Sequence, residues 1–343
     1  YKAYQSSKNA GEKDETYAYQ YIRHIMAMIN GIDFSYVKNL EPRDKGPMNS
    51  LDMSTHVTSL VSGIYYCLDS QYMTADRLTA MIKHCYLLSR WQVKKFFGTM
   101  DNNWTSYATG SVYAFISRFK EISTHDEWME SLKAEYARMM GKATLADGMC
   151  LELPMHYIEV ILSTYSSPFA IAEGSGEDLP YGPQQLKSIR DTVMTLVYSK
   201  GPYHGFNQHD TYDAYDSIKS IYTKWYNYGL KYNIFEAEDL ENLKYLSTDG
   251  VNGSMPEYPT IHYPVGKKTF MRSGWNKNDT MLSFINNYSN EVSHRHKDVL
   301  SLARFAHGKY LLTDQGYGAL LTGGMFNYML SPVQHNLVTV NDT

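Results

Sequence analysis

Apolar residues recur with the spacing of an α-helix from the N-terminus to about Tyr245. The clearest stripe comprises Leu78, Met81, Ile82, Cys85 and Leu88. Positions three or four apart share one helix face, and Thr74 stands where a capping residue is expected. Similar stripes occupy Tyr19–Ile29, Val57–Leu68, Tyr113–Phe119, Trp128–Met140, Ile158–Tyr165, Leu186–Val197 and Ile218–Leu230. Breaks rich in Gly, Asn and Pro separate them, which predicts a run of helical hairpins without a parallel sheet.

The pattern changes at Thr248–Ser254, which is rich in turn-forming residues. Short β-like runs follow at Thr260–Val265, Lys268–Arg272, Met281–Asn286, Val299–Phe305, Lys309–Thr313 and Leu337–Val340. Helices followed by strands predict an α+β chain with a helical domain (1–247) and an antiparallel β domain (248–343). The last of about six strands has no obvious partner. We therefore expect an incomplete sheet and a missing C-terminal portion.

Composition narrows the possible partners. The chain of 343 residues is long enough for two domains, and its formal net charge of −4 provides no basic field to recruit nucleic acid. An anionic partner would have to be bound by local Arg, Lys and Asn. The 31 Tyr and 5 Trp offer flat faces suited to sugar rings, although most are expected to be ordinary core and surface residues.

Neither a membrane span nor a disulfide framework is expected. No apolar run reaches the length needed to cross a bilayer. The three cysteines lie in apolar surroundings without CxxC spacing, which predicts buried thiols. No signal peptide is visible, and the start at Tyr1-Lys2-Ala3 indicates a processed or trimmed product. The sequence indicates neither an organic cofactor nor an oligomeric state.

The stretch Ser293–Asp298 holds two histidines one residue apart. On a strand, His294 and His296 would project to the same face. His296 is predicted to bind one divalent cation together with Asp314 and His335 downstream. His294 would then be free for a catalytic role. Mixed imidazole and carboxylate ligands suit Zn²⁺ better than Ca²⁺. We interpret the ion as structural; the alternative is a hydrogen-bonded polar cluster without a metal.

Four sequence blocks in the β part resemble the heparinase II/III-like polysaccharide lyases, a group that includes related alginate lyases. The blocks are Phe270–Trp275, Ser293–Ser301, Gly308–Gly316 and His335–Val340. A weaker likeness covers Asp101–Trp104, and Asp147-Gly148 followed by Glu152–Tyr157. The resemblance implies an incomplete (α/α) toroid followed by an antiparallel β-sandwich, which agrees with the order of helices and strands above.

The resemblance also implies cleavage of a uronic-acid polysaccharide, alginate or a glycosaminoglycan, by β-elimination. Such a reaction needs a group that neutralises the uronate carboxylate, a base for the C5 proton and an acid for the O4 oxygen. Asn103 is the expected neutraliser, since its amide can donate to the charge that builds up. The family has Asn or His here, often with a neighbouring His, whereas this chain has Asn102 and Trp104. The alternative is that Asn102-Asn103 forms a turn or helix cap.

Tyr157 resembles the family's catalytic tyrosine and is the expected base. A phenol has a pKa near ~10 and needs nearby cations or donors to favour its ionised form. His156 would point about 100° away on a helix, as a substrate contact or a packed helix histidine. His294 is the second proton-transfer candidate, because imidazole exchanges protons near neutral pH; its alternative is a strand histidine bonded to the backbone.

The remaining predicted substrate contacts are Asn102, Trp104, Tyr203, His204, Arg272 and Arg295. Tyr203 and His204 belong to a polar, aromatic loop, and the arginines provide charge for carboxylates. The alternatives are that Trp104 anchors the core and that the charged side chains are solvated.

Two other functions share parts of this pattern. A uronate C5-epimerase begins with the same proton removal, and a non-catalytic polysaccharide-binding protein would keep the fold without the chemistry. A metallohydrolase ranks last, because the His-x-His pair lacks the Glu of the helical zinc-hydrolase motif. The substrate class implies a secreted or periplasmic location.

Overall fold

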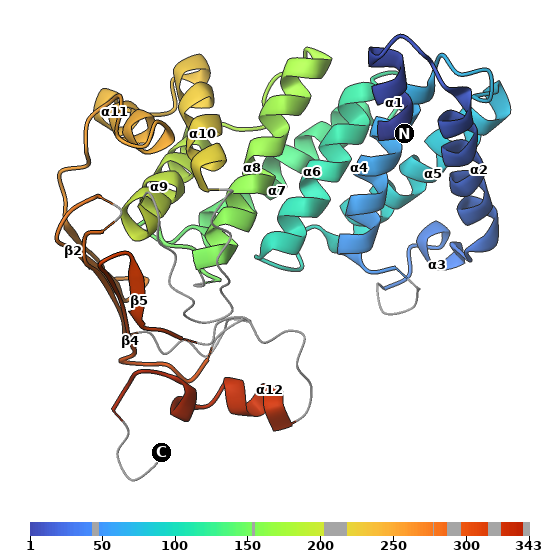
Figure 1. Cartoon of the computed structure of the whole chain (residues 1–343). Helices are drawn as coiled ribbons and strands as arrows, with labels where there is room; N and C mark the ends of the chain where they lie inside the picture. The colour runs from blue at the N-terminus through green and yellow to red at the C-terminus, as the bar shows by residue number, and fades with distance from the viewer. Residues whose placement is uncertain are drawn as a thin grey trace. The chain divides into compact units, whose positions relative to one another are not determined.

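A computed structural model describes residues 1–42, 48–152, 155–201, 218–276, 278–286, 296–314 and 324–338, together forming helices and one sheet (Figure 1). Contacts divide the chain into two compact units. Unit 1 is Tyr1–Met139 with Ser167–Pro180, and unit 2 is Met140–Ser166 with Tyr181–Thr343. This grouping by contacts differs from the predicted division at residue 247, which remains a prediction about domains.

Unit 1 is helical. Its helices are α1 (Lys2–Asn9), α2 (Glu15–Gly31), α3 (Ser35–Lys38), α4 (Ser50–Cys67), α5 (Ala75–Trp91), α6 (Asn103–Arg118) and most of α7 (His125–Ala143). A π-helical turn, Gln92–Phe96, follows α5. The predicted cap is confirmed, because the side chain of Thr74 accepts a hydrogen bond from the backbone N–H of Arg77. Since an uncapped helix leaves such donors unsatisfied, this bond defines where α5 begins.

Helix α6 runs through the core of unit 1 and packs against α4 (Figure 1). Of its 16 residues, 13 are buried. Two of its buried hydroxyls avoid a desolvation penalty by bonding to the preceding turn: Thr109 donates to the carbonyl of Thr105 at 3.0 Å, and Ser111 to that of Ala108 at 2.9 Å. A helix with small or apolar residues on all faces is typical of a core position.

Unit 2 contains helices and all described strands. Its helices are the first part of α8 (Met155–Ser175), then α9 (Pro183–Lys200), α10 (Ile218–Tyr232) and α11 (Ala237–Ser247). Helix α9 begins with Pro183, whose missing N–H costs nothing in the first turn, and ends at Gly201 with φ +64°. The positive φ favours glycine, and a Cβ at Gly201 would lie 2.8 Å from Nη1 of Arg272, so a side chain there would also displace the guanidinium.

The strands of unit 2 form one antiparallel sheet in sequential order. They are β1 (Thr260–Tyr263), β2 (Lys268–Arg272), β3 (Met281–Ile285), β4 (Leu302–Ala306) and β5 (Lys309–Leu312). Alternation along β3 buries Met281, Ser283 and Ile285, as expected for a sheet with one covered face. The predicted order of helices and then antiparallel strands is confirmed, and β2 has the predicted bounds.

The end of the chain departs from prediction. Leu337 and Val338 form no strand, while the rest of the predicted strand Leu337–Val340 lies outside the described residues. Helix α12 (Gly324–Met329) and the 3₁₀ turn Pro332–Gln334 stand before it instead. The described strands make a single sheet, and a second sheet of the expected sandwich is not among them.

The carboxylate of Asp147 links the helices of unit 2 to its sheet. Its Oδ2 accepts the backbone N–H groups of Val265 and Gly266, in the turn between β1 and β2, at 2.8 and 2.9 Å. The next residue, Gly148, has φ +86°, and a Cβ there would lie 2.9 Å from the backbone oxygen of Asp191 on α9. The Asp147-Gly148 pair therefore holds a helix, a loop and a β-hairpin together.

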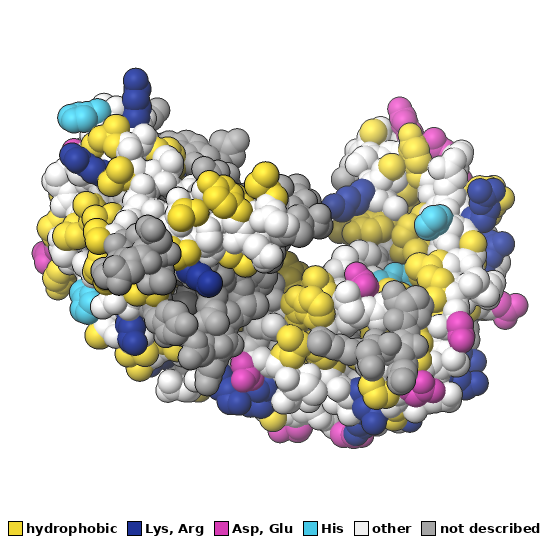
Figure 2. Space-filling model, turned by 90° about the horizontal axis from the view of Figure 1, so that it is seen from below, with side chains coloured by type: hydrophobic (Ala, Val, Ile, Leu, Met, Phe, Trp, Pro, Cys, Tyr) yellow, Lys and Arg dark blue, Asp and Glu magenta, His cyan; other side chains and the backbone are white. Residues whose placement is uncertain are grey.

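Two further predictions concern the surface and the thiols. Among the described helices, none combines the length and apolar character needed to cross a bilayer. Charged side chains of both signs are interspersed over the coloured residues of the face in Figure 2, without a broad field of one sign. Cys67, Cys85 and Cys150 are free and buried, as predicted.

Candidate functional site

The predicted carboxylate-neutralising segment lies at the start of α6 in unit 1. Asn102 is the N-cap, and its side chain accepts the N–H of Trp104 at 3.2 Å. The helix-cap interpretation therefore holds for Asn102. It does not account for Asn103, which is the first helical residue and is 9% exposed. Trp104 is half-buried, as either a core anchor or a sugar platform would be.

The loop before α6 is fixed by two charged residues of α7. Arg138 pairs with Asp101 and donates from Nη2 to the carbonyl of Met100 at 2.7 Å. Glu135 receives Nε of Arg138 and the N–H of Gly98, each at 2.9 Å. The hydrogen bond with Glu135 raises the pKa of Arg138, so the guanidinium stays charged. This network sets the backbone that leads into the start of α6.

The predicted base, Tyr157, lies in the first turn of α8 in unit 2. It is 8% exposed, and its ring meets the edge of the His156 ring with centroids 5.7 Å apart and planes at 76°. His156 is half-buried. The rings of these adjacent helix residues are thus in edge contact, and the predicted divergence of about 100° stays a prediction.

A buried carboxylate stands beside this pair. Oε2 of Glu159 lies 3.9 Å from Nδ1 of His156, and Oε1 forms an ion pair with Lys200 at the end of α9. Glu159 and Lys200 are only 5% and 3% exposed. Burial by itself would raise the pKa of Glu159, but the neighbouring His156 and the charge of Lys200 hold it below its ordinary value. The carboxylate is therefore ionised at neutral pH beside His156.

Arg272, a predicted substrate contact, is engaged within unit 2. Its guanidinium lies 4.5 Å from the centroid of the Trp275 ring, and Nη2 donates to the carbonyl of Tyr198 at 3.3 Å. Burial lowers its pKa to about 10. These contacts give the side chain a packing role at the end of α9, and its contact with substrate stays a prediction.

The three predicted metal ligands come together in unit 2. His296, Asp314 and His335 are buried, and their potential ligand atoms all lie within 4.8 Å of one another. Nδ1 of His335 is 2.6 Å from Oδ2 of Asp314, and the two histidine rings are 5.2 Å apart. The sequence placed these residues in three separate blocks, and the fold unites them.

Backbone and amide contacts hold two of these ligands in register. Nδ2 of Asn336 donates to the carbonyl of Thr313 at 2.7 Å, and its own carbonyl accepts the N–H of Leu302 at 3.0 Å. The first bond joins the neighbour of His335 to the neighbour of Asp314, and the second joins the neighbour of His335 to β4. Asn336 lies within the sequence block His335–Val340, where no role was predicted for it.

The cluster fits a cation of the zinc type. A carboxylate only accepts, so Nδ1 of His335 carries a hydrogen, and in the neutral imidazole the lone pair is then on Nε2. That Nε2 is buried and has no hydrogen-bond partner among the described residues, which is costly unless a further group occupies it. Two imidazoles and a carboxylate are a donor set suited to Zn²⁺, and a carboxylate oriented on the far nitrogen is common around zinc histidines.

Four predicted site residues, His294, Arg295, Tyr203 and His204, lie outside the described residues. Asn103 belongs to unit 1, and Tyr157 belongs to unit 2 with the metal cluster. Their joint action is a prediction from sequence. The Glu159–Lys200 pair was missed, because charges 41 positions apart leave no periodic signal in the sequence.

Comparison with known proteins decides the family. No curated protein matches the sequence significantly. The family described as heparinase II/III N-terminus, however, matches residues 2–238, well over half of the chain. The chain belongs to the heparinase II/III family. The N-terminal region that defines this family thus corresponds to helices α1 to α10 and the start of α11.

Solved structures share the fold of this heparinase II/III family chain. A heparinase III crystal structure matches with a TM-score of 0.82 at 16% identity over 98% of this chain and 53% of the other. A second heparinase III gene product gives 0.78 at 18%, covering 98% and 54%. A heparan sulfate lyase HepC from Pedobacter heparinus gives 0.68 at 18%, covering 94% and 49%. The chain spans about half the length of these proteins.

Proposed function

We propose that the protein is a polysaccharide lyase that cleaves a uronic-acid-containing polymer by β-elimination. The family match over residues 2–238 carries this proposal. The similar structures are heparinases III and a heparan sulfate lyase, which favours a glycosaminoglycan over alginate as the substrate. A polymeric substrate of this kind also favours a secreted or periplasmic location.

In the proposed reaction Asn103 makes the C5 proton removable. Its side-chain amide donates to the uronate carboxylate, whose negative charge grows as an enolate-like intermediate forms. A donor that is fixed beforehand stabilises this charge without reorganising. The Arg138–Glu135 network provides such fixation, because it holds the loop that leads into the start of α6.

Tyr157 is the proposed base. The phenolate takes the C5 proton, the C–H electrons form the C4=C5 double bond, and the C4–O4 bond breaks. His294, or the phenol that has just gained the proton, then gives a proton to O4. The products are a new chain end and an unsaturated uronate. Residues Asn102, Trp104, His156, Tyr203, His204, Arg272 and Arg295 are the proposed contacts to the polymer.

His296, Asp314 and His335 are proposed to hold one structural Zn²⁺. The ion would order the segment that begins at His296, and so present His294, two residues earlier. Support comes from the buried donor set and from the unpaired Nε2 of His335. No proton transfer in the scheme depends on the ion.

A panel of glycosaminoglycans and alginates, followed by ultraviolet absorbance, tests the proposal. Lyase action produces an absorbing unsaturated uronate, and Tyr157→Phe and Asn103→Ala should each reduce the rate by 10²-fold or more, about the contribution of one positioned acid–base group. Tyr19→Phe, which loses the same hydroxyl from a surface helix, is the matched control. Solvent deuterium at C5 without absorbance would identify an epimerase instead. Binding without either signal would identify a carbohydrate-binding protein.

A further inference from the structure

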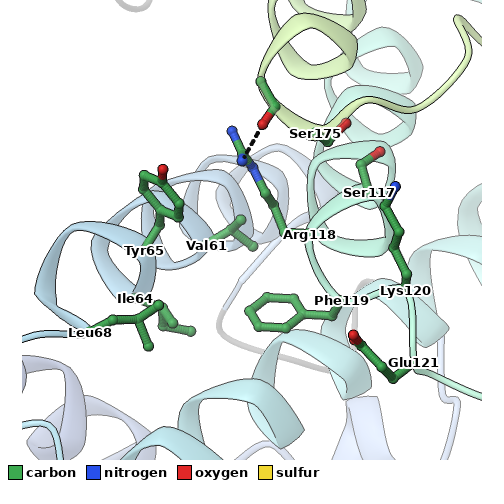
Figure 3. Close-up of a pocket in the computed structure, with 11 residues that line it drawn as sticks. Val61, Ile64, Tyr65, Leu68, Ser117, Arg118, Phe119, Lys120, Glu121 and Ser175 are labelled. Atoms are coloured by element: carbon green, nitrogen blue, oxygen red, sulfur yellow. Dashed lines mark hydrogen bonds between the residues drawn. The ribbon is translucent and has the colours of Figure 1, made fainter.

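Unit 1 contains a cavity of about 390 Å³ where three helices end. These are α4, ending at Cys67, α6, ending at Arg118, and α8, ending at Ser175 (Figure 3). Helix α6 starts at Asn103 and has 16 residues. At about 1.5 Å per residue, the cavity lies roughly 24 Å along α6 from the proposed catalytic asparagine. It is therefore a separate site.

One wall of the cavity is apolar. Figure 3 shows Val61, Ile64 and Tyr65 of α4 and its C-cap residue Leu68 on one side, with Phe119 on the other. Tyr65 is 56% exposed and Leu68 50% exposed, although both are large apolar side chains. An aromatic ring and an aliphatic side chain next to each other suit the C–H face of a sugar ring.

Arg118 gives the cavity a positive charge, in a lining that also includes Lys120 and Glu121. Its guanidinium lies 4.9 Å from the centroid of the Tyr65 ring, and Nη1 donates to the carbonyl of Gly174 at 2.8 Å. Among the described residues it has no carboxylate partner, whereas neighbouring Lys120 is paired with Glu177 at 2.6 Å. A guanidinium has five N–H donors in a planar fork that matches carboxylate or sulfate.

Gly174 leaves room for the guanidinium of this arginine. A Cβ on Gly174 would lie 2.6 Å from Nη2 of Arg118, closer than real Cβ contacts. The guanidinium can lie against the end of α8 only because no side chain stands there. The cavity therefore keeps its cation in a defined place beside the Tyr65 ring.

The helix ends decide between a bare anion and a sugar. Each helix C-terminus carries about half a negative charge, which opposes an inorganic anion. Last-turn carbonyls can instead accept hydrogen bonds from hydroxyl groups. A ligand with several hydroxyls and one acidic group satisfies both the carbonyls and Arg118. An acidic sugar has this chemistry, and about 390 Å³ lies at the small end of the ~300–1,000 Å³ typical of ligand sites.

We propose that this cavity, formed around Tyr65 and Arg118, is a second, non-catalytic binding site for one or two residues of an acidic polysaccharide. Identifying that polysaccharide with the substrate rests on the proposed lyase function. The site holds the polymer on unit 1, away from the reacting residues, and raises the local concentration of cleavable bonds. Its effect should grow with chain length, because only a long polymer reaches two sites at once.

The test uses protein carrying Tyr157→Phe, so that the oligosaccharide is not consumed. A heparan sulfate octasaccharide is titrated by calorimetry and by NMR of the protein. Tyr65→Ala and Arg118→Ala should each weaken one class of binding by about 10-fold, the loss of one stacking or charge-assisted contact. Arg23→Ala is the matched control, since Arg23 also lies over a tyrosine, Tyr19, at 6.0 Å, but does not line this cavity.

Kinetics with the otherwise unsubstituted protein separates the two proposals. Arg118→Ala should raise KM for long polymer several-fold while leaving kcat/KM for a tetrasaccharide unchanged. If the protein cleaves the polymer but Tyr65→Ala and Arg118→Ala leave octasaccharide binding unchanged, the second site is overturned and the proposed function stands. Arg118-dependent binding without cleavage of any polymer supports the site and overturns the lyase. Competition by inorganic sulfate as effective as that of the octasaccharide would overturn sugar recognition.

Discussion

Nδ1 of His335 lies 2.6 Å from Oδ2 of Asp314, and both side chains are fully excluded from solvent. Because the carboxylate can only accept, this contact fixes the tautomer of His335 and leaves its Nε2 as a lone-pair donor. The hydrogen bond to Asp314 thus orients the imidazole of His335 so that it can bind a metal ion. Binding a cation would require little rearrangement of this histidine.

Loss of His335 should remove the ion. We expect His335→Ala to abolish stoichiometric zinc and to lower Tm, since a ligand at about 100 times its Kd stabilises the native state by ~2.7 kcal/mol. Metal analysis after dialysis, with thermal unfolding in the presence and absence of chelator, measures both effects. His262→Ala is the control, because His262 is an exposed histidine of β1 outside the cluster. Equal zinc content in both variants would contradict the site.

Removal of the charge of Glu159 should leave Lys200 buried without its partner. Breaking a buried ion pair typically costs about 3–5 kcal/mol, so Glu159→Gln should lower the free energy of unfolding by that amount. The double variant Glu159→Gln with Lys200→Met should recover much of it, because no unpaired charge remains. Denaturant unfolding of the single and double variants measures the coupling, and equal stabilities of the two would argue against the pair.

The same pair should weaken in acid. The pKa of Glu159 is lowered in the folded protein, so its stabilising effect is complete above the unfolded value of 4.5 and is lost as pH falls through the folded value. The stability difference between wild type and Glu159→Gln should therefore shrink below about pH 4.5. Unfolding curves at several pH values between 3 and 7 measure this difference. A constant difference would mean that Glu159 does not titrate as described.

Arg138 should support activity without touching substrate. Arg138→Met leaves the buried Glu135 unpaired and releases the carbonyl of Met100, so we expect a loss of about 3 kcal/mol in unfolding free energy and a lower kcat. Lys133→Met on the same helix breaks an exposed pair with Glu130 and should change stability by less than about 1 kcal/mol. Similar losses in both variants would remove the special role of the Arg138 network.

Lys268 should make the free energy of unfolding rise with pH in the alkaline range. Burial lowers its pKa from 10.5 to about 8, with Asp298 partly opposing the shift. Between these values the unfolded chain binds a proton that the folded one does not, so this lysine makes stability rise with pH by up to about 1.4 kcal/mol per unit. Urea unfolding at pH 7 and 9 should show this rise in wild type relative to Lys268→Met. Parallel changes in the two proteins would refute it.

Local signals explain what the sequence predicted well. Thr74 and the spacing of its helix depend on neighbours a few positions away, and so do the bounds of β2. The metal cluster was found because histidine, aspartate and histidine are rare and chemically specific together. Such features can be predicted without knowing which helices pack together.

Long-range pairings escaped prediction. Glu159 of α8 meets Lys200 of α9. Arg272 stacks on Trp275 and lies next to Gly201. Neither arrangement follows from the periodicity of the sequence. The predicted strand at Leu337–Val340 failed at its first two residues, with which no strand of the described residues pairs. Tertiary neighbours decide these cases.

Asp147 bears on how the chain can be divided. Its carboxylate is bonded to two backbone amides of the β1–β2 turn, so a cut near residue 248 would separate an acceptor from both of its donors. It would also strip Met149 from its contact beside Gly266. A fragment designed from the helix-to-strand change alone would thus expose surfaces that belong together, and expression studies should retain the first hairpin with the helices.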